Sequence, residues 1–176
     1  MSLPLAAASS RRLLSGCASA GRLARMRFVI LASEVNKQQV SALVTGATGT
    51  LIRAGVISKH IELMWVPGAF ELPVVAARLV ASARSPNAII ALGAIIRGQT
   101  PHYNVIAHAV AQGLEQVAVS ARIPVTFGII VATTLAQAKA RAGGSMGNRG
   151  ADAALAAIAV LHLFDRAGIR QRFRAD

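Results

Sequence analysis

The chain has 176 residues, of which 54% are hydrophobic, and it carries 19 Lys and Arg residues against 7 Asp and Glu residues. This length suits a single domain with a sizeable core, and so large an apolar share excludes intrinsic disorder. The longest apolar runs, Ala88–Ile96 and Ala153–Leu161, have nine residues each, whereas a membrane-spanning helix needs about 20, so we expect a soluble protein. Cys17 is the only cysteine, which excludes an internal disulfide and any cysteine-based metal site.

The formal net charge of +12 is spread over the whole chain. Residues 1–25 contribute +4 from four arginines and contain no acid, and residues 26–176 contribute +8 from 15 bases and 7 acids. Five Phe, one Tyr and one Trp leave few rings to stack on nucleic-acid bases, so a nucleic-acid partner is not expected. A basic surface that attracts phosphorylated ligands is the simpler interpretation.

Residues 1–25 are rich in Ala, Ser and Arg. That composition is typical of an organellar transit peptide, but it also fits an upstream extension of a chain whose true start is Met26. The first alternative predicts an organellar location and the second a cytoplasmic one. Under either, we expect residues 1–25 to be mobile and outside the core, a folded domain over residues 26–168, and a tail over residues 169–176.

From Arg27 onward, short apolar runs alternate with helix-length segments. The runs are rich in β-branched residues and predict strands buried on both faces of a parallel sheet, at Phe28–Ala32, Ile61–Val66, Ala88–Ile96 and Pro124–Val131. Helices are predicted at residues 37–54, 101–121, about 134–142 and 149–165. This alternation predicts an α/β fold, a three-layer sandwich whose ligands bind outside the carboxyl ends of the strands.

The segment Val44–Gly49 resembles the opening of a dinucleotide-binding loop. Ile52 occupies the place of the third glycine, and the segment lies inside a span with helical periodicity rather than after a strand. We therefore interpret it as part of an amphipathic helix that carries two glycines.

The segment Trp65–Pro73 combines a strand end, a Pro-Gly turn and a helix start with one acid, Glu71. This carboxylate can accept hydrogen bonds from hydroxyl or N–H groups of a ligand. Alternatively, it only complements the positive end of the helix dipole.

The segment Gly93–Tyr103 is the most informative. A buried strand ends at Ile96, and Thr100 and Pro101 suit the N-cap and the first position of a helix. The free N–H groups of that helix start predict an anion site, with Gly98 allowing close approach. His102 lies in the first turn, where the helix dipole disfavours an imidazolium, so a neutral ring able to exchange protons with a ligand is expected. The alternative is a histidine that merely faces solvent; His60, His108 and His162 lack such a setting.

The segment Lys139–Gly150 joins two predicted helices through Gly143, Gly144 and Gly147. Arg141 ends the first of them. Its guanidinium could bind a phosphate in bidentate fashion, or only complement the negative end of that helix.

Four motifs resemble those of the lumazine synthase family. They are VPGAFELP at 66–73, GAIIRGQTPHY at 93–103, PVTFG at 124–128 and RAGGSMGNRG at 141–150, in the family's order and spacing. The resemblance covers about residues 27–165.

The resemblance implies a flavodoxin-like fold with a four-stranded parallel sheet, and homopentamers with active sites between subunits, in some members as 60-subunit shells. It implies that 5-amino-6-(D-ribitylamino)uracil condenses with 3,4-dihydroxy-2-butanone 4-phosphate to 6,7-dimethyl-8-ribityllumazine, the penultimate step of riboflavin biosynthesis. No metal or organic cofactor is implied.

The resemblance also implies site residues. His102 matches the proton-transfer histidine. The phosphate-binding set matches Gln99, Thr100 and Arg141, and Phe127 matches an aromatic residue supplied by the adjacent subunit. The positions that hold the pyrimidine and its ribityl chain match Val35, Asn36, Ala69, Phe70, Glu71, Ala94, Ile95 and Ile96.

Two positions depart from the family pattern. An aromatic residue that stacks on the pyrimidine is replaced by Val35, which could weaken pyrimidine binding by roughly 1–3 kcal/mol. The Thr-Thr-acid sequence after the PVxFG strand is replaced by Val131, Ala132 and Thr133. An alternative is therefore a catalytically weak relative that assembles or binds ligands.

Overall fold

The computed structural model describes residues 21–169, which fold around one sheet of four parallel strands in the order β2-β1-β3-β4. The strands are β1 (Phe28–Ser33), β2 (Ile61–Val66), β3 (Ala88–Ile96) and β4 (Val125–Ala132). Each predicted strand is confirmed with bounds that differ by one residue at most, and so is the predicted four-stranded parallel sheet.

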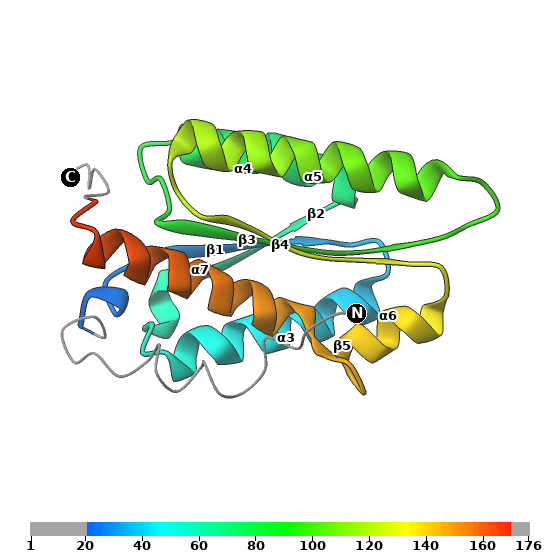
Figure 1. Ribbon diagram of the computed structural model, residues 1–176, viewed down its shortest axis with the longest axis horizontal. Helices are drawn as coiled ribbons and strands as arrows, with labels where there is room; N and C mark the ends of the chain where they lie inside the picture. Colours follow the sequence, from blue (N-terminus) through cyan, green and yellow to red (C-terminus); the bar gives the residue numbers. More distant parts are fainter. Residues whose placement is uncertain (1–20, 170–176) are drawn as a thin grey trace.

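Helices cover both faces of the sheet (Figure 1). One face carries α4 (Leu72–Val80) and α5 (His102–Ala121), and the other carries α3 (Lys37–Arg53), α6 (Leu135–Arg141) and α7 (Arg149–Arg166). Two 3₁₀ turns, η1 (Ser58–His60) and η2 (Ala69–Glu71), precede β2 and α4, and a small hairpin of β5 (Ala142–Gly144) and β6 (Gly147–Asn148) joins α6 to α7. The three-layer α/β/α sandwich is confirmed. The hairpin was not predicted, and α4 was foreseen only as a helix start.

The two layers of core explain why the strands read as unbroken apolar runs. Along β1, Phe28 and Ile30 pack with α3 and α7, whereas Val29 and Leu31 pack with α4 and α5. All four side chains are fully buried. A strand with helices on both faces has no solvent side, so its sequence shows no polar alternation.

Close contact between α3 and α7 accounts for the glycines at residues 44–49. A Cβ on Gly46 would lie 2.3 Å from Oδ1 of Asn148, and a Cβ on Gly150 would lie 2.1 Å from the carbonyl oxygen of Leu43. Asn148 Nδ2 donates to the Ala42 carbonyl at 2.8 Å, while its Oδ1 accepts from the N–H of Gly150 at 2.9 Å and caps α7. The segment is thus helical, as predicted, and its glycine at 46 serves helix packing.

The packed part of the chain begins before Met26. Leu23 is only 2% exposed and belongs to the core on the α3–α7 side, and Arg22 forms an ion pair with Asp165 at the end of α7. The expectation that residues up to 25 lie outside the core is therefore wrong for Leu23, because an apolar side chain beside β1 is buried regardless of the charge around it. Residues 1–20, which include Cys17, and residues 170–176 lie outside the described part of the chain.

Candidate active site

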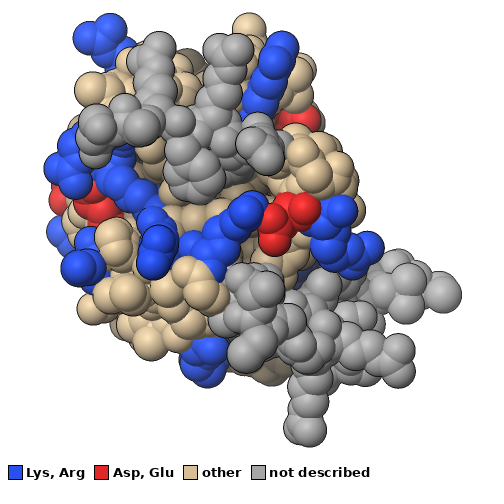
Figure 2. All heavy atoms as spheres, turned by 90° about the vertical axis from the view of Figure 1, so that its left-hand side faces the viewer, with Lys and Arg blue, Asp and Glu red and all other residues tan. Residues whose placement is uncertain are grey.

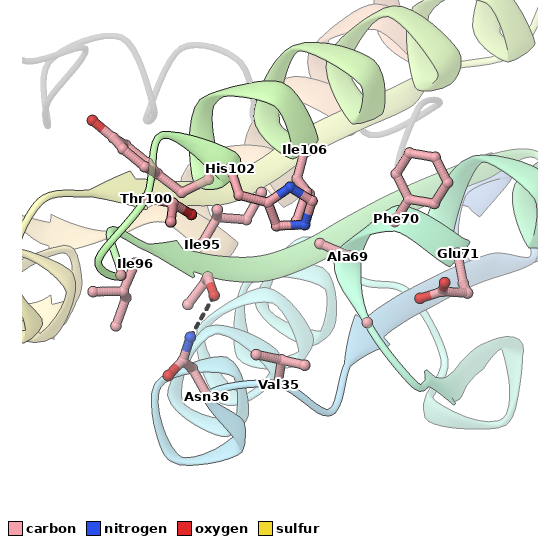
Figure 3. A pocket seen from close by; sticks show the side chains of 14 residues that line it. Val35, Asn36, Ala69, Phe70, Glu71, Ile95, Ile96, Thr100, His102 and Ile106 are labelled. Carbon is pink, nitrogen blue, oxygen red and sulfur yellow. Dashed lines mark hydrogen bonds between the residues drawn. The ribbon is translucent and has the colours of Figure 1, made fainter.

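A cavity of about 410 Å³ opens at the carboxyl ends of the strands, where the fold predicts a ligand site (Figure 3). It brings together the ends of β1 and β3, the turn after β2 and the start of α5. The lining residues are Val35, Asn36, Gly68, Ala69, Phe70, Glu71, Ala94, Ile95, Ile96, Gly98, Thr100, His102, Tyr103 and Ile106.

The first wall comes from the turn between β1 and α3. Asn36 adopts a left-handed conformation with φ of 57°, and its Nδ2 donates to the carbonyl of Ala94 at 2.7 Å. This bond ties the β1 turn to the end of β3 and fixes the width of the cavity between them. Val35, 55% exposed, presents its methyl groups at the rim.

The second wall is the turn after β2, formed by Gly68 and η2. Glu71 folds back over Gly68, so that a Cβ on Gly68 would lie 2.8 Å from Oε2 of Glu71. Ala69 is buried under the wall, whereas Phe70 is 61% exposed. Glu71 is the only acidic residue of the lining, so one hydrogen-bond acceptor of full charge faces an otherwise largely apolar chamber.

The floor of the cavity is the end of β3. Ala94 and Ile95 are almost fully buried, and Ile96 is the last residue of the strand. Small and branched apolar side chains here make a flat surface suited to a planar ring.

His102 is the first residue of α5, and in Figure 3 its imidazole projects over the cavity between Ile95 and Phe70. The N-cap position is held by Pro101, which has no side-chain cap, so the prediction that Thr100 caps the helix is wrong. The helix begins one residue later than predicted. The carbonyl oxygen of Pro101 accepts a hydrogen bond from the N–H of Asn104 at 2.9 Å, which closes the turn before the helix. The start of α5 still lines the cavity, and unpaired N–H groups in the first turn of a helix stabilise an anion beside them.

Ten of the thirteen predicted site residues line this cavity, and three do not. Gln99 lies in the exposed loop between two lining residues, Gly98 and Thr100. Phe127 is 44% exposed on β4, which is an edge strand of the sheet. Arg141 ends α6, on the face of the sheet opposite α5 (Figure 1). One subunit therefore does not unite Arg141 with His102.

Four lining residues were absent from the predicted set: Gly68, Gly98, Tyr103 and Ile106. Ile106 follows His102 by four residues, so the two share a helix face, and this spacing was a usable signal. Tyr103 packs partly against the core on the α4–α5 side.

The cavity-lining residues include no Lys or Arg, and the described residues contain no group of three or more His, Cys, Asp or Glu side chains that could hold a metal ion. The titratable groups of the lining are Glu71, His102 and Tyr103. This set favours proton transfer on a neutral, largely planar ligand.

Comparison with known proteins agrees with this geometry. Residues 25–165 match the family model of 6,7-dimethyl-8-ribityllumazine synthase. The chain is 48% identical over 141 residues to a protein of that name from Gemmatimonas aurantiaca, an alignment that covers 80% of this chain and 85% of the relative. Proteins of the same name from Coxiella burnetii (42% over 137 residues, 78% and 90% covered) and Leuconostoc mesenteroides (37% over 140 residues, 80% and 89% covered) are also similar.

The matched region contains every element from β1 to α7, except the last residue of α7, and all the residues that line the cavity. The chain belongs to the 6,7-dimethyl-8-ribityllumazine synthase family.

Proposed function

We propose that this protein is a lumazine synthase, a transferase that condenses 5-amino-6-(D-ribitylamino)uracil with 3,4-dihydroxy-2-butanone 4-phosphate. The products are 6,7-dimethyl-8-ribityllumazine, orthophosphate and water. The observation that carries the proposal is the cavity at the strand ends, which gathers ten of the residues that the family resemblance implies, His102 among them.

The aminouracil ring lies on the floor formed by Ala94, Ile95 and Ile96, with its other face toward Val35. The apolar floor shields the ring from water. Beyond Leu92 the backbone of β3 no longer pairs with β1, so groups on that edge can pair with the polar ring edge. The ribityl chain runs along the second wall, where Glu71 accepts hydrogen bonds from its hydroxyls.

The reaction is a sequence of proton movements, and His102 stands where they occur. The 5-amino group of the uracil attacks the ketone carbon, and the resulting carbinolamine loses water to give an imine. Elimination of orthophosphate follows and leaves an enol, which tautomerises to a second ketone. The ribitylamino nitrogen attacks this carbonyl, and loss of a second water closes the ring. An imidazole accepts and returns protons in these steps, a contribution of typically 10²–10⁴-fold to the rate.

The phosphate requires positive charge that the lining does not supply. The free amides at the start of α5, with Thr100 and Gln99, bind part of the dianion. The remaining charge comes from Arg141 of a neighbouring subunit, and Phe127 of a neighbour closes the ring site. This completion supports a homopentamer with its sites between subunits, alone or as the unit of a 60-subunit shell.

The test is direct. Purified protein is mixed with both substrates, and formation of the lumazine is followed by its absorbance. We expect a rate far above the spontaneous condensation; a rate equal to the spontaneous one would overturn the proposal. Light scattering and negative-stain imaging of the same sample distinguish a pentamer from a shell.

No helix in the described residues is long and apolar enough to cross a membrane. We propose a cytoplasmic location, with an organellar one as the alternative if residues 1–25 act as a transit peptide. Mass spectrometry of the mature N-terminus separates the two.

A further inference from the structure

The end of the molecule opposite the cavity is strongly basic. There the four strands begin and α3, α4, α5 and α7 end. Figure 2 looks onto this face and shows Lys and Arg side chains spread across it, with few acidic ones. We call it the amino-end face; its basic residues are Arg22, Arg25, Arg27, Arg53, Lys59, Arg78, Arg84, Arg122 and Arg166, and its acids are Glu62 and Asp165.

Ordinary structural roles account for some of this charge. Asp165 pairs with Arg22 and Glu62 with Arg27. Each helix carboxyl end carries about half a negative charge, and one arginine lies in or next to the last turn of each of the four helices: Arg53, Arg78, Arg122 and Arg166. Those four positive charges exceed the roughly two negative charges they meet.

Three exposed bases have neither role: Arg25, Lys59 and Arg84. None forms an ion pair among the described residues, although the Arg84 carbonyl accepts a hydrogen bond from Arg27. The charge on this face is therefore in excess of what the fold requires.

Exposed apolar side chains accompany the bases. Ile52 lies in the last turn of α3, Ile57 just before η1, and Leu163 and Ile169 at the end of α7; each is 45–55% exposed. No exposed aromatic residue lies at this end within the described chain. Isolated bases and aliphatic side chains without aromatic rings suit a protein surface better than nucleic-acid bases, which are bound by stacking.

We propose that the amino-end face binds an acidic, amphipathic polypeptide segment of a partner protein. Its carboxylates pair with Arg25, Lys59 and Arg84, because guanidinium and ammonium groups match carboxylates in charge and geometry. Its apolar side chains cover Ile57 and Leu163. The face lies at the far end of the strands from the cavity, so the partner binds without blocking substrate entry.

The experiment uses the assembled full-length protein and a fluorescein-labelled peptide of about 20 residues in which leucines recur at helical spacing among glutamates. Fluorescence anisotropy at low salt measures binding. A peptide with glutamine for every glutamate tests the charge, polyglutamate of equal length tests the apolar contribution, and an RNA duplex of similar charge tests the rival ligand. We expect the amphipathic acidic peptide to bind most tightly, with an affinity that falls as salt rises toward about 0.3 M.

Matched variants locate the site. Lys59→Gln with Arg84→Gln removes two charges from the amino-end face, and Lys37→Gln with Lys139→Gln removes two at the opposite end. The variant of Lys59 and Arg84 should weaken peptide binding by about fivefold or more, because it loses two exposed charge pairs with the peptide. The variant of Lys37 and Lys139 should weaken binding by less than about twofold. Ile57→Ser should weaken binding of the amphipathic peptide but not of polyglutamate.

Each remaining outcome overturns the proposal. Equal losses in the two double variants mean attraction by net charge alone. Tighter binding of the RNA duplex, with the same loss in the Lys59 and Arg84 variant, makes the face a nucleic-acid site. Absence of peptide binding at low salt means that the face has no such partner. None of these results bears on lumazine formation, which is measured separately.

Discussion

At the residue scale, the cavity combines an anchored frame with exposed reactive groups. Asn36 is held in a left-handed conformation by its bond to the Ala94 carbonyl, whereas His102, Phe70 and Val35 are exposed. A left-handed asparagine is tolerated at modest cost, and here it sets the distance between two strand ends. The chemistry therefore depends on side chains that can change without disturbing the fold.

Replacing His102 tests the proton-transfer role. We expect His102→Ala to lower kcat by about 10²-fold, because the general acid–base contribution is lost, with assembly unchanged since the side chain is exposed. Steady-state kinetics and light scattering measure the two effects. His108→Ala is the matched control: it is exposed on the same helix, outside the cavity. A kcat within about twofold of the unmodified protein would exclude His102 as the proton carrier.

Replacing Val35 tests the missing aromatic face. Val35→Phe should lower the KM for the aminouracil by about fivefold or more, because stacking on a ring contributes roughly 1–3 kcal/mol. Val119→Phe, on another exposed valine near the end of α5, should leave the KM unchanged. A higher KM in Val35→Phe would contradict the claim that residue 35 faces the pyrimidine ring.

The cavity residues were predictable to the extent that they lie in local motifs. Gly68 to Glu71 and Ile95 to His102 are short segments whose positions follow once each strand end is known. Phe127 and Arg141 differ, because we propose that they act in a site shared with a second subunit, and the tertiary contacts of one chain do not determine such a site. The one-residue error at the start of α5 arose because Thr100 and Pro101 both suit a helix start, and only the loop path selects between them.

At the element scale, the crossing of α3 and α7 depends on a single side chain. Asn148 caps α7, donates to α3 and occupies the space that a Cβ on Gly46 would need. Two helices from the two ends of the domain are thereby joined at close range. Within the motif at residues 141–150, Asn148 and Gly150 thus have a structural role. Arg141, at the start of the same motif, has a proposed role in the reaction.

The contact between Gly46 and Asn148 predicts that one substitution changes the free energy of unfolding in opposite directions in two backgrounds. Gly46→Ala should destabilise the protein, since the new methyl group meets the Asn148 side chain, although alanine favours helix by about 1 kcal/mol over glycine. In an Asn148→Ala background, which itself costs about 1 kcal/mol from the lost cap, Gly46→Ala should become stabilising. Gly49→Ala, which meets only the end of the Arg53 side chain at 3.1 Å, should have the same effect in both backgrounds. Additive effects of Gly46→Ala and Asn148→Ala would contradict the contact.

The strands and long helices followed from sequence because both carry strong patterns: apolar runs buried on two faces, or periodic apolar faces of 17 to 20 residues. The β5–β6 hairpin has strands of three and two residues and is rich in glycine, so it has no periodicity to detect. The helix α4 is only nine residues long and follows its 3₁₀ turn directly, so its end could not be predicted.

At the scale of the whole molecule, the two ends of the sheet differ in shape and in charge. The carboxyl ends hold the cavity, without a cation in its lining, and the amino ends carry the excess of positive charge. In the proposed reaction a second copy supplies the cation for the phosphate, since the pocket lining has none and Arg141 lies on the other face of the sheet.

Mixed assemblies test this completion. His102→Ala and Arg141→Ala, each nearly inactive as a homo-oligomer, should recover about a quarter of full activity when coassembled in equal amounts, because that share of subunit boundaries pairs two unmodified residues. Coexpression with two affinity tags isolates the mixed species. The control is a mixture of the two separately assembled proteins, which should stay inactive. Inactive mixed assemblies would place both residues in the site of one subunit.

The sheet order also has a consequence for biosynthesis. The first strand to leave the ribosome, β1, is central, and its two neighbours follow it in the chain. One face of β1 is completed only when α7, the last helix of the described chain, packs near it. At about 5–20 residues per second, α7 emerges several seconds after β1. A nascent chain without α7 therefore exposes Ile30 and Leu92 to solvent, and chaperones that hold apolar segments should bind it until translation ends.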